Sequence, residues 1–158
     1  MKNIITFAFY KATAPHADWS DKTISWWTKG PYSHVELIFD NMMHSSSPRD
    51  GHVRSKPHKK DYDTWDYINV EIDGAGITRI RKFFEKTAGH RYDWPGILGF
   101  VIPVYDSEKK YFCSEWCSKA GIIGGIECLF DKNPSRISPN RLANILIKEG
   151  GYELIRKN

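Results

Sequence analysis

Cys113 is the side chain in this sequence that is best placed for nucleophilic chemistry. It follows Tyr111 and Phe112 and opens a segment with helical character, Ser114 to Ala120. The unpaired amides and the dipole at a helix N-terminus favour a thiolate, the reactive form of cysteine. The same amides can donate to an oxyanion that develops during acyl transfer. A buried, inert thiol is the commonest alternative for a free cysteine.

His34 is the candidate base for this nucleophile. It lies in an expected strand over residues 32–40, where Glu36 and Ile38 share its face and Val35 and Leu37 occupy the other. A histidine and a glutamate on a buried strand face need partners, and a catalytic base with its orienting group meets that need. A solvent-facing strand side explains the same residues equally well.

His44 and Glu36 compete for the role of the group that orients the His34 ring. Asp40 and Asn41 form a tight turn, after which His44 lies on the returning strand. Pairing symmetric about this turn places residue 37 opposite His44, so contact between the two histidines requires a bulge or a diagonal reach. Glu36 is about 6–7 Å from His34 along the strand. We predict His44, because a neutral ring adds no negative charge beside the thiolate.

The stretches that carry these residues resemble a known family. They read Tyr32-Ser33-His34-Val35, Met43-His44-Ser45, Gly89-His90-Arg91-Tyr92-Asp93, Phe112-Cys113-Ser114-Glu115 and Ser138-Pro139-Asn140. They resemble the NlpC-type papain-like cysteine peptidases and amidases. The histidine hairpin precedes the cysteine by 79 residues, which is the order of the circularly permuted branch, and the resemblance covers roughly residues 30–145.

The resemblance implies a papain-like fold and a set of functional residues. Cys113 would be the nucleophile, His34 the base, His44 the third polar group and Tyr92 a group near the oxyanion site, with no cofactor or metal. The implied reaction is hydrolysis of an amide bond in a peptidoglycan stem peptide through an acyl-enzyme. The permuted branch also contains acyltransferases, thioesterases and lipid amidases, which form the alternative within this fold.

Two further alternatives belong to different classes of protein. His34, His44, Cys113 and Cys117 have the side-chain types of a two-histidine, two-cysteine zinc site. A Cys-x-x-x-Cys pair within a helix is poorly placed beside this hairpin, so zinc is the less favoured interpretation. A non-catalytic binding module on the same fold is the third, and the intact cysteine–histidine pair argues against it.

Composition sets the broad class. The chain has 158 residues, 41% hydrophobic and 27% charged, which predicts one globular domain over 1–158. The net charge is +4 (23 basic and 19 acidic side chains) and is spread along the chain. The run from Lys56 to Lys60 lies beside Asp61 and Asp63, and we interpret it as a solvated loop and not a nucleic-acid site. Three cysteines, an odd number, do not indicate a disulfide framework.

The sequence also bears on location. No stretch approaches the roughly 18 apolar residues of a membrane span. The N-terminal apolar run lacks a small-residue cleavage site, so we expect synthesis without a signal peptide, in the cytoplasm. A phage-encoded enzyme could reach the cell wall without one. The sequence predicts no oligomeric state.

Hydrophobic periodicity and turn residues predict the elements that position these side chains. The expected strands are 3–10, 32–40, 42–46, 66–72 and 152–155, with a short strand at Val53 and a loop over 55–64. The expected helices are 18–29, 77–89, 94–101, 114–120 and 139–149. Strands followed by helices predict an α+β domain whose central antiparallel sheet is packed by helices. Trp19, Trp26, Trp27 and Trp94 could line a groove, but we assign them to the core.

Overall fold

The computed structural model describes residues 2–14, 30–93 and 110–157. Eight strands in these ranges form one sheet in the order β7-β6-β4-β3-β2-β1-β5-β8. The strands are β1 (Lys2–Lys11), β2 (Tyr32–Phe39), β3 (Met42–Ser47), β4 (His52–Pro57), β5 (Trp65–Asp73), β6 (Arg91–Tyr92), β7 (Lys110–Tyr111) and β8 (Leu154–Ile155). The described α-helices are α2 (Gly74–Thr87), α4 (Cys113–Gly124) and α5 (Pro139–Lys148). Short 3-10 turns at Glu127–Leu129 and Pro134–Arg136 link α4 to α5.

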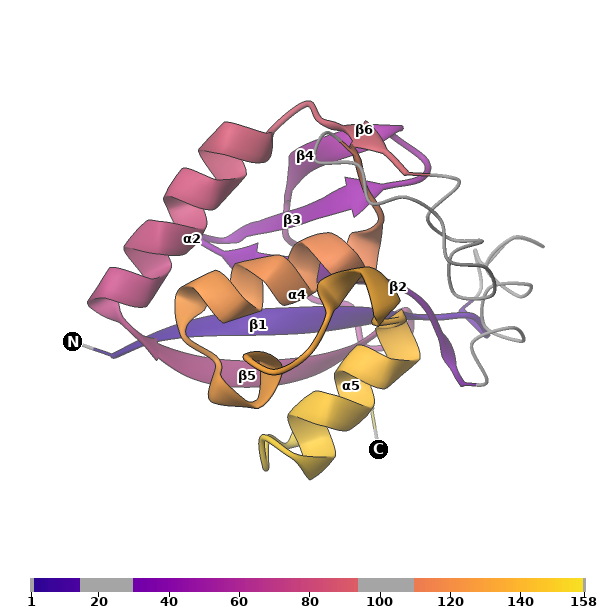
Figure 1. The fold of residues 1–158 in the computed structure, drawn as a ribbon. Coiled ribbons are helices and arrows are strands. Elements are labelled where there is room, and N and C mark those ends of the chain that lie inside the picture. Colours follow the sequence, from indigo (N-terminus) through magenta and orange to yellow (C-terminus); the bar gives the residue numbers. More distant parts are fainter. Residues whose placement is uncertain (1, 15–29, 94–109, 158) are drawn as a thin grey trace.

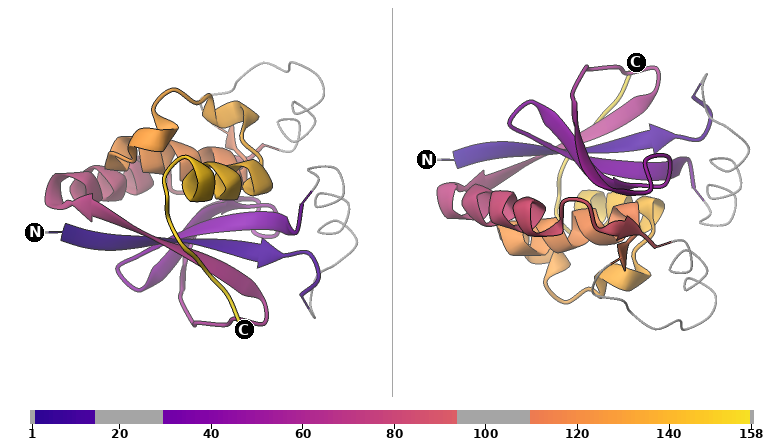
Figure 2. Two further views of the ribbon diagram at one scale, coloured as in Figure 1. Left: turned by 90° about the horizontal axis from the view of Figure 1, so that it is seen from below. Right: turned by 90° about the horizontal axis from the view of Figure 1, so that it is seen from above.

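The architecture is the mixed α+β class that the sequence predicted. All neighbouring strands pair antiparallel except β6 and β7, which are parallel. The three helices lie together on one face of the sheet, as Figures 1 and 2 show. β2 lies inside the sheet between β1 and β3, so His34 stands on an interior strand, as expected.

The main core fills the space between the sheet and the helices. On β1, the alternating residues Ile5, Phe7 and Phe9 are fully buried in it, as the period-2 pattern requires. Trp116 of α4 is also fully buried, and its indole N–H donates to Thr87 Oγ1 of α2 at 2.9 Å. The polar end of this large side chain is therefore satisfied inside the core.

Local sequence signals explain where several elements begin and end. Asp40 and Asn41 have φ of 52° and 59°, which fits the two-residue turn that joins strands such as β2 and β3. Ser138 caps α5 through its side-chain oxygen, which accepts from the Arg141 N–H, and Pro139 occupies the first turn. Gly125 ends α4 with φ of 99°, a conformation that glycine adopts without strain.

Some expectations about elements need correction. The strand expected at Val53 extends over His52–Pro57, because it pairs with β3 along its whole length, so the loop begins three residues later than predicted. The last strand is only Leu154–Ile155. The helices expected at 18–29 and 94–101, and the four tryptophans assigned to the core, lie outside the described residues. No helix in the described part of the chain is long and apolar enough to cross a membrane.

Candidate active site

Cys113 is the first residue of α4. The preceding residue, Phe112, has extended backbone angles, and the first α4 hydrogen bond runs from the Trp116 N–H to the Phe112 carbonyl at 3.0 Å. Cys113 is therefore in the first turn, where the helix dipole favours negative charge. The adjacent hydroxyl of Ser114 donates to the Ile137 carbonyl at 2.5 Å, so it points to another partner and is not the nucleophile.

Helix α4 contacts β2 just beyond the end of the β2–β3 pairing. The two strands pair over Leu37–Phe39 and Met42–His44. Beyond these pairs, the Val35 carbonyl accepts from Ser45 Oγ at 2.9 Å and from Cys117 Sγ at 3.6 Å. The Cys117 thiol therefore links α4 to β2. Cys113, one helical turn earlier, approaches another residue of β2.

That residue is His34. Its side chain is 12% exposed, and Cys113 is 4% exposed, so charges on the two groups are poorly screened. Burial opposes protonation of His34, but charge and hydrogen-bond interactions with Cys113, followed by those with Glu36, raise the pKa of His34 to about 9. The structure thus brings together the predicted nucleophile and the predicted base.

Glu36 is the group that contacts the His34 ring. Its Oε1 is 3.1 Å from His34 Nε2, which leaves the other ring nitrogen, Nδ1, without an oxygen or nitrogen partner among the described residues. Burial alone would raise the pKa of Glu36, but hydrogen bonds from Arg54 and His34 lower it to about 2. Glu36 is therefore ionised at neutral pH and accepts a hydrogen bond from the His34 ring.

His44 does not take this role, so the prediction that it orients His34 is wrong. The register pairs His44 with Leu37, as symmetry about the turn predicted, and no bulge brings it closer to His34. Its ring stacks on Phe39, with centroids 3.8 Å apart and planes 9° apart. Neither ring nitrogen has a hydrogen-bond partner within the described ranges. Burial lowers the pKa of His44 to about 4, so it is a neutral, packed ring.

Tyr92 lies near the thiol, as the resemblance implied. It is the second residue of β6 and pairs with Tyr111 of β7, which is two residues before Cys113. Burial, together with the charges of Cys113 and Asp93, raises the pKa of Tyr92 well above its ordinary value. Its hydroxyl therefore stays protonated and able to donate.

The sequence analysis missed the aromatic surroundings of His34. Tyr10 of β1 is opposite His34 on one side and opposite Trp65 of β5 on the other, so the three side chains share one face of the sheet. The His34 and Trp65 ring centroids are 6.3 Å apart, and Arg49 lies over the Tyr10 ring at 5.3 Å. Pairing the expected strands 3–10 and 32–40 in register would have revealed Tyr10, whereas Trp65 lies just before the strand expected over 66–72.

The other two cysteines lie apart from the reacting pair, and the four side chains considered for zinc do not form a group of metal ligands among the described residues. Cys117 is fully buried, and burial is the main cause that raises the pKa of its thiol. Cys128 is only partly buried and lies in the 3-10 turn Glu127–Leu129. In the ranges 2–14, 30–93 and 110–157, no three His, Cys, Asp or Glu side chains are grouped as metal ligands.

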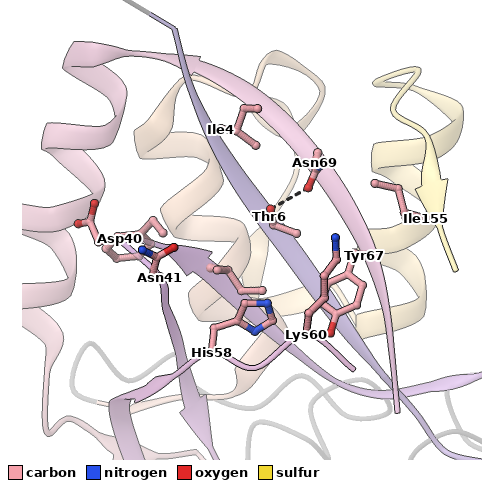
Figure 3. Close-up of a pocket in the computed structure, with 11 residues that line it drawn as sticks. Ile4, Thr6, Asp40, Asn41, His58, Lys60, Tyr67, Asn69 and Ile155 are labelled. Atoms are coloured by element: carbon pink, nitrogen blue, oxygen red, sulfur yellow. Dashed lines mark hydrogen bonds between the residues drawn. The ribbon is translucent and has the colours of Figure 1, made fainter. Parts of the chain in front are cut away.

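A pocket of about 320 Å³ lies elsewhere on the sheet (Figure 3). Its lining includes Thr6, Asn41, Lys60 and Asn69, and Thr6 donates to Asn69 across the strands at 2.7 Å. Thr6 is four residues from Tyr10 on one face of β1, about 13 Å along the strand, whereas Tyr67, which also lines the pocket, is opposite Ala8, only two residues from Tyr10. Cys113, His34 and Glu36 do not line it, so it is distinct from the candidate active site.

Comparison with known proteins does not assign a family to the chain. No protein-family model matches the sequence, and the curated proteins contain no significant match. The functional interpretation therefore depends on the geometry of Cys113, His34 and Glu36.

Proposed function

We propose that this protein is a cysteine hydrolase in which Cys113 is the nucleophile, His34 the general base and Glu36 the residue that orients His34. The observation that carries the proposal is the placement of a histidine, held by an ionised glutamate at 3.1 Å, beside a cysteine at a helix N-terminus. These are the components of an activated thiol nucleophile and its oriented base. The resemblance to permuted NlpC-type enzymes supports the same assignment of Cys113 and His34.

The geometry suggests how the reaction would proceed. The Cys113 sulfur attacks the substrate carbonyl carbon, and the resulting oxyanion is stabilised by amides at the start of α4 and by the Tyr92 hydroxyl. His34, carrying the thiol proton, delivers it to the leaving amine as the carbon–nitrogen bond breaks. Water, deprotonated by His34, then attacks the thioester and releases the acid and the free thiol. Glu36 holds Nε2 throughout, so Nδ1 is the nitrogen that exchanges the proton.

The substrate class follows from the resemblance. We propose an amide bond of a peptidoglycan stem peptide, with a cleavage product that carries a new carboxylate. Trp65 lies beside His34, with ring centroids 6.3 Å apart, and the cation of Arg49 lies over the Tyr10 ring, so a polar peptide would find a charged partner in this region.

The first test measures thiol reactivity. The protein is treated with iodoacetamide between pH 5 and 9, and the labelled peptides are mapped by mass spectrometry. We expect Cys113 to label first, because a thiol at a helix N-terminus beside a histidine base is activated as a nucleophile. Cys128 is the internal control, since burial raises the pKa of its thiol. Preferential labelling of Cys128 would contradict the assignment.

The second test measures turnover. Peptidoglycan fragments are incubated with the wild type, Cys113→Ala and the control Cys128→Ala, and the products are identified by mass. Loss of the nucleophile should reduce turnover by about 10⁴-fold or more, whereas Cys128→Ala should retain it. Equal turnover by Cys113→Ala and the wild type would refute the hydrolase proposal. Cleavage of acyl esters or thioesters in preference to peptides would change the proposed substrate class but leave the assignment of Cys113 as the nucleophile intact.

A further inference from the structure

Arg54 of β4 binds the carboxylate of Glu36, which contacts the His34 ring. Its Nη1 donates to Glu36 Oε2 at 2.8 Å and its Nη2 donates to Glu36 Oε1 at 2.7 Å. Its Nε donates to Asp50 Oδ2 at 2.7 Å. The side chain is 11% exposed, and every part of the guanidinium group faces a carboxylate.

The register of the sheet explains how an arginine reaches across two strands. Glu36 is opposite Ala8 on β1, and extending the β2–β3 register by one residue places Ser45 on its other side. Ser45 is opposite Arg54 on β4. Because Ser45 is small, the arginine can cross β3 and meet the carboxylate about 10 Å away in the strand-to-strand direction. Such two-point pairing fixes the plane of the carboxylate as well as its position.

The shared oxygen links Arg54 to the reacting groups. Glu36 Oε1 is bound by Arg54 Nη2 at 2.7 Å and lies 3.1 Å from His34 Nε2. The oxygen that orients the histidine is thus itself fixed by the arginine. A buried carboxylate without a cationic partner tends to take up a proton, and a protonated Glu36 could no longer stabilise a charged His34 ring.

We propose that Arg54 is a positioning residue of this site. It keeps the Glu36 carboxylate ionised and fixes the plane of that carboxylate beside the His34 ring. In this way it controls the charge state of the imidazole that faces Cys113. This inference deepens the proposed hydrolase function and rests on it. The hydrogen bonds of Arg54 among the described residues go to Glu36 and Asp50, so it acts on His34 through Glu36. Nothing in the sequence motifs marks this residue, because the contact depends on three strands pairing in register.

Several other charged or titratable groups act on Glu36 or are acted on by it. These come from four parts of the chain: His34 on β2, His44 on β3, His58 in the segment after β4, and Cys117 on α4. Arg54 is the cation that is hydrogen-bonded to Glu36 through both carboxylate oxygens. Its removal therefore affects the site mainly through the carboxylate.

The test uses Arg54→Met, which keeps a long side chain and removes the charge and the donors. The rate of Cys113 alkylation by iodoacetamide is measured from pH 5 to 9. We expect the midpoint of the profile to move to higher pH by about one unit or more, which is a tenfold loss of rate on its acid limb. Lys56→Met is the matched control, since Lys56 contacts Asp50 at 2.8 Å and is half-exposed, and its profile should match the wild type.

A double variant separates positioning from folding. In Glu36→Gln/Arg54→Met both charges are absent, so no unpaired buried charge remains to destabilise the fold. We expect this variant to have the profile of Glu36→Gln alone, because the effect of Arg54 on His34 is carried by the carboxylate. An Arg54→Met profile that superimposes on the wild type, or an equal effect of Arg54→Met with and without Glu36, would overturn the inference and leave the hydrolase proposal intact. A wild-type Cys113 no more reactive than Cys128 would overturn both.

Discussion

At the scale of single residues, the two candidates for the third member of the site have opposite environments. Glu36 is buried but fully hydrogen-bonded, with Arg54 and His34 around its carboxylate. His44 is buried between aromatic rings, Phe39 in a stack and Phe84 edge-on at 4.5 Å. A polar ring without hydrogen bonds in an apolar environment stays neutral, so His44 contributes packing. Residue type alone could not distinguish these roles.

Substitution of His44 by leucine tests its structural role. The folded protein keeps His44 neutral, with a pKa of about 4, whereas an unfolded histidine has a pKa of about 6.5. This depressed pKa contributes stability above pH 6.5 that is lost as the pH falls toward 4. Between pH 7 and pH 4.5, the free energy of unfolding of the wild type should therefore decline by up to about 3 kcal/mol more than that of His44→Leu. Urea unfolding at each pH measures the difference.

Thiol reactivity provides the second measurement on the same variant. Leucine can pack against Phe39 and Phe84, so Cys113 alkylation by His44→Leu should stay within about twofold of the wild type. Glu36→Gln, which keeps the shape of the side chain and removes its charge, is the comparison. If His44→Leu slows alkylation as much as Glu36→Gln does, His44 contributes to the reactivity of Cys113, and its assignment as a packing residue is wrong.

At the scale of elements, the sequence predicts regular segments well and their junctions poorly. The strands β1, β2, β3 and β5 and the helix α5 follow from alternation, turn residues and a Ser-Pro cap. The two-residue strands β6 and β7 are too short to show a period, so neither they nor their parallel pairing was predicted. The hydrogen bonds that the Val35 carbonyl accepts from Ser45 Oγ and Cys117 Sγ also escape prediction, because they depend on how β3 and α4 pack against β2.

The contact between α2 and α4 provides a prediction at this scale. A Cβ added to Gly76 would run into the carbonyl oxygen of Gly124 and lie 2.9 Å from Asp73 Oδ1, the side chain that caps α2. Because backbone cannot move aside easily, Gly76→Ala should lower the free energy of unfolding by about 1–3 kcal/mol. Gly74→Ala is the matched control: Gly74 is exposed in the same helix, and a change within about 1 kcal/mol of the wild type is expected. Equal stability of the two variants would contradict the close approach of the helices.

At the scale of the whole molecule, the candidate site depends on segments distant in the sequence. His34 and Glu36 come from β2, Arg54 from β4, Tyr92 from β6 and Cys113 from α4. The sequence motifs named His34, Tyr92 and Cys113, and strand geometry named Glu36 as the alternative to His44. The contacts between them could not be predicted, since register and helix placement are set by the packed sheet. The C-terminal helix α5 also contributes. Asn140 accepts from the Tyr32 N–H at 2.9 Å and donates to the Tyr32 carbonyl at 2.8 Å.

Asn140 thus extends the hydrogen bonding of β2 from a position 108 residues later in the chain. Asn140→Ala should leave the Tyr32 N–H and carbonyl without these partners in a buried environment. Each such loss costs about 1–3 kcal/mol, so we expect the free energy of unfolding to fall by about 2–4 kcal/mol in urea denaturation. Because His34 lies two residues after Tyr32, the rate of Cys113 alkylation should fall as well. Asn133→Ala is the matched control, since Asn133 caps only a short exposed turn through Ser135, and it should leave alkylation unchanged. If Asn140→Ala is as stable and as reactive as the wild type, α5 does not support the strand that carries the base.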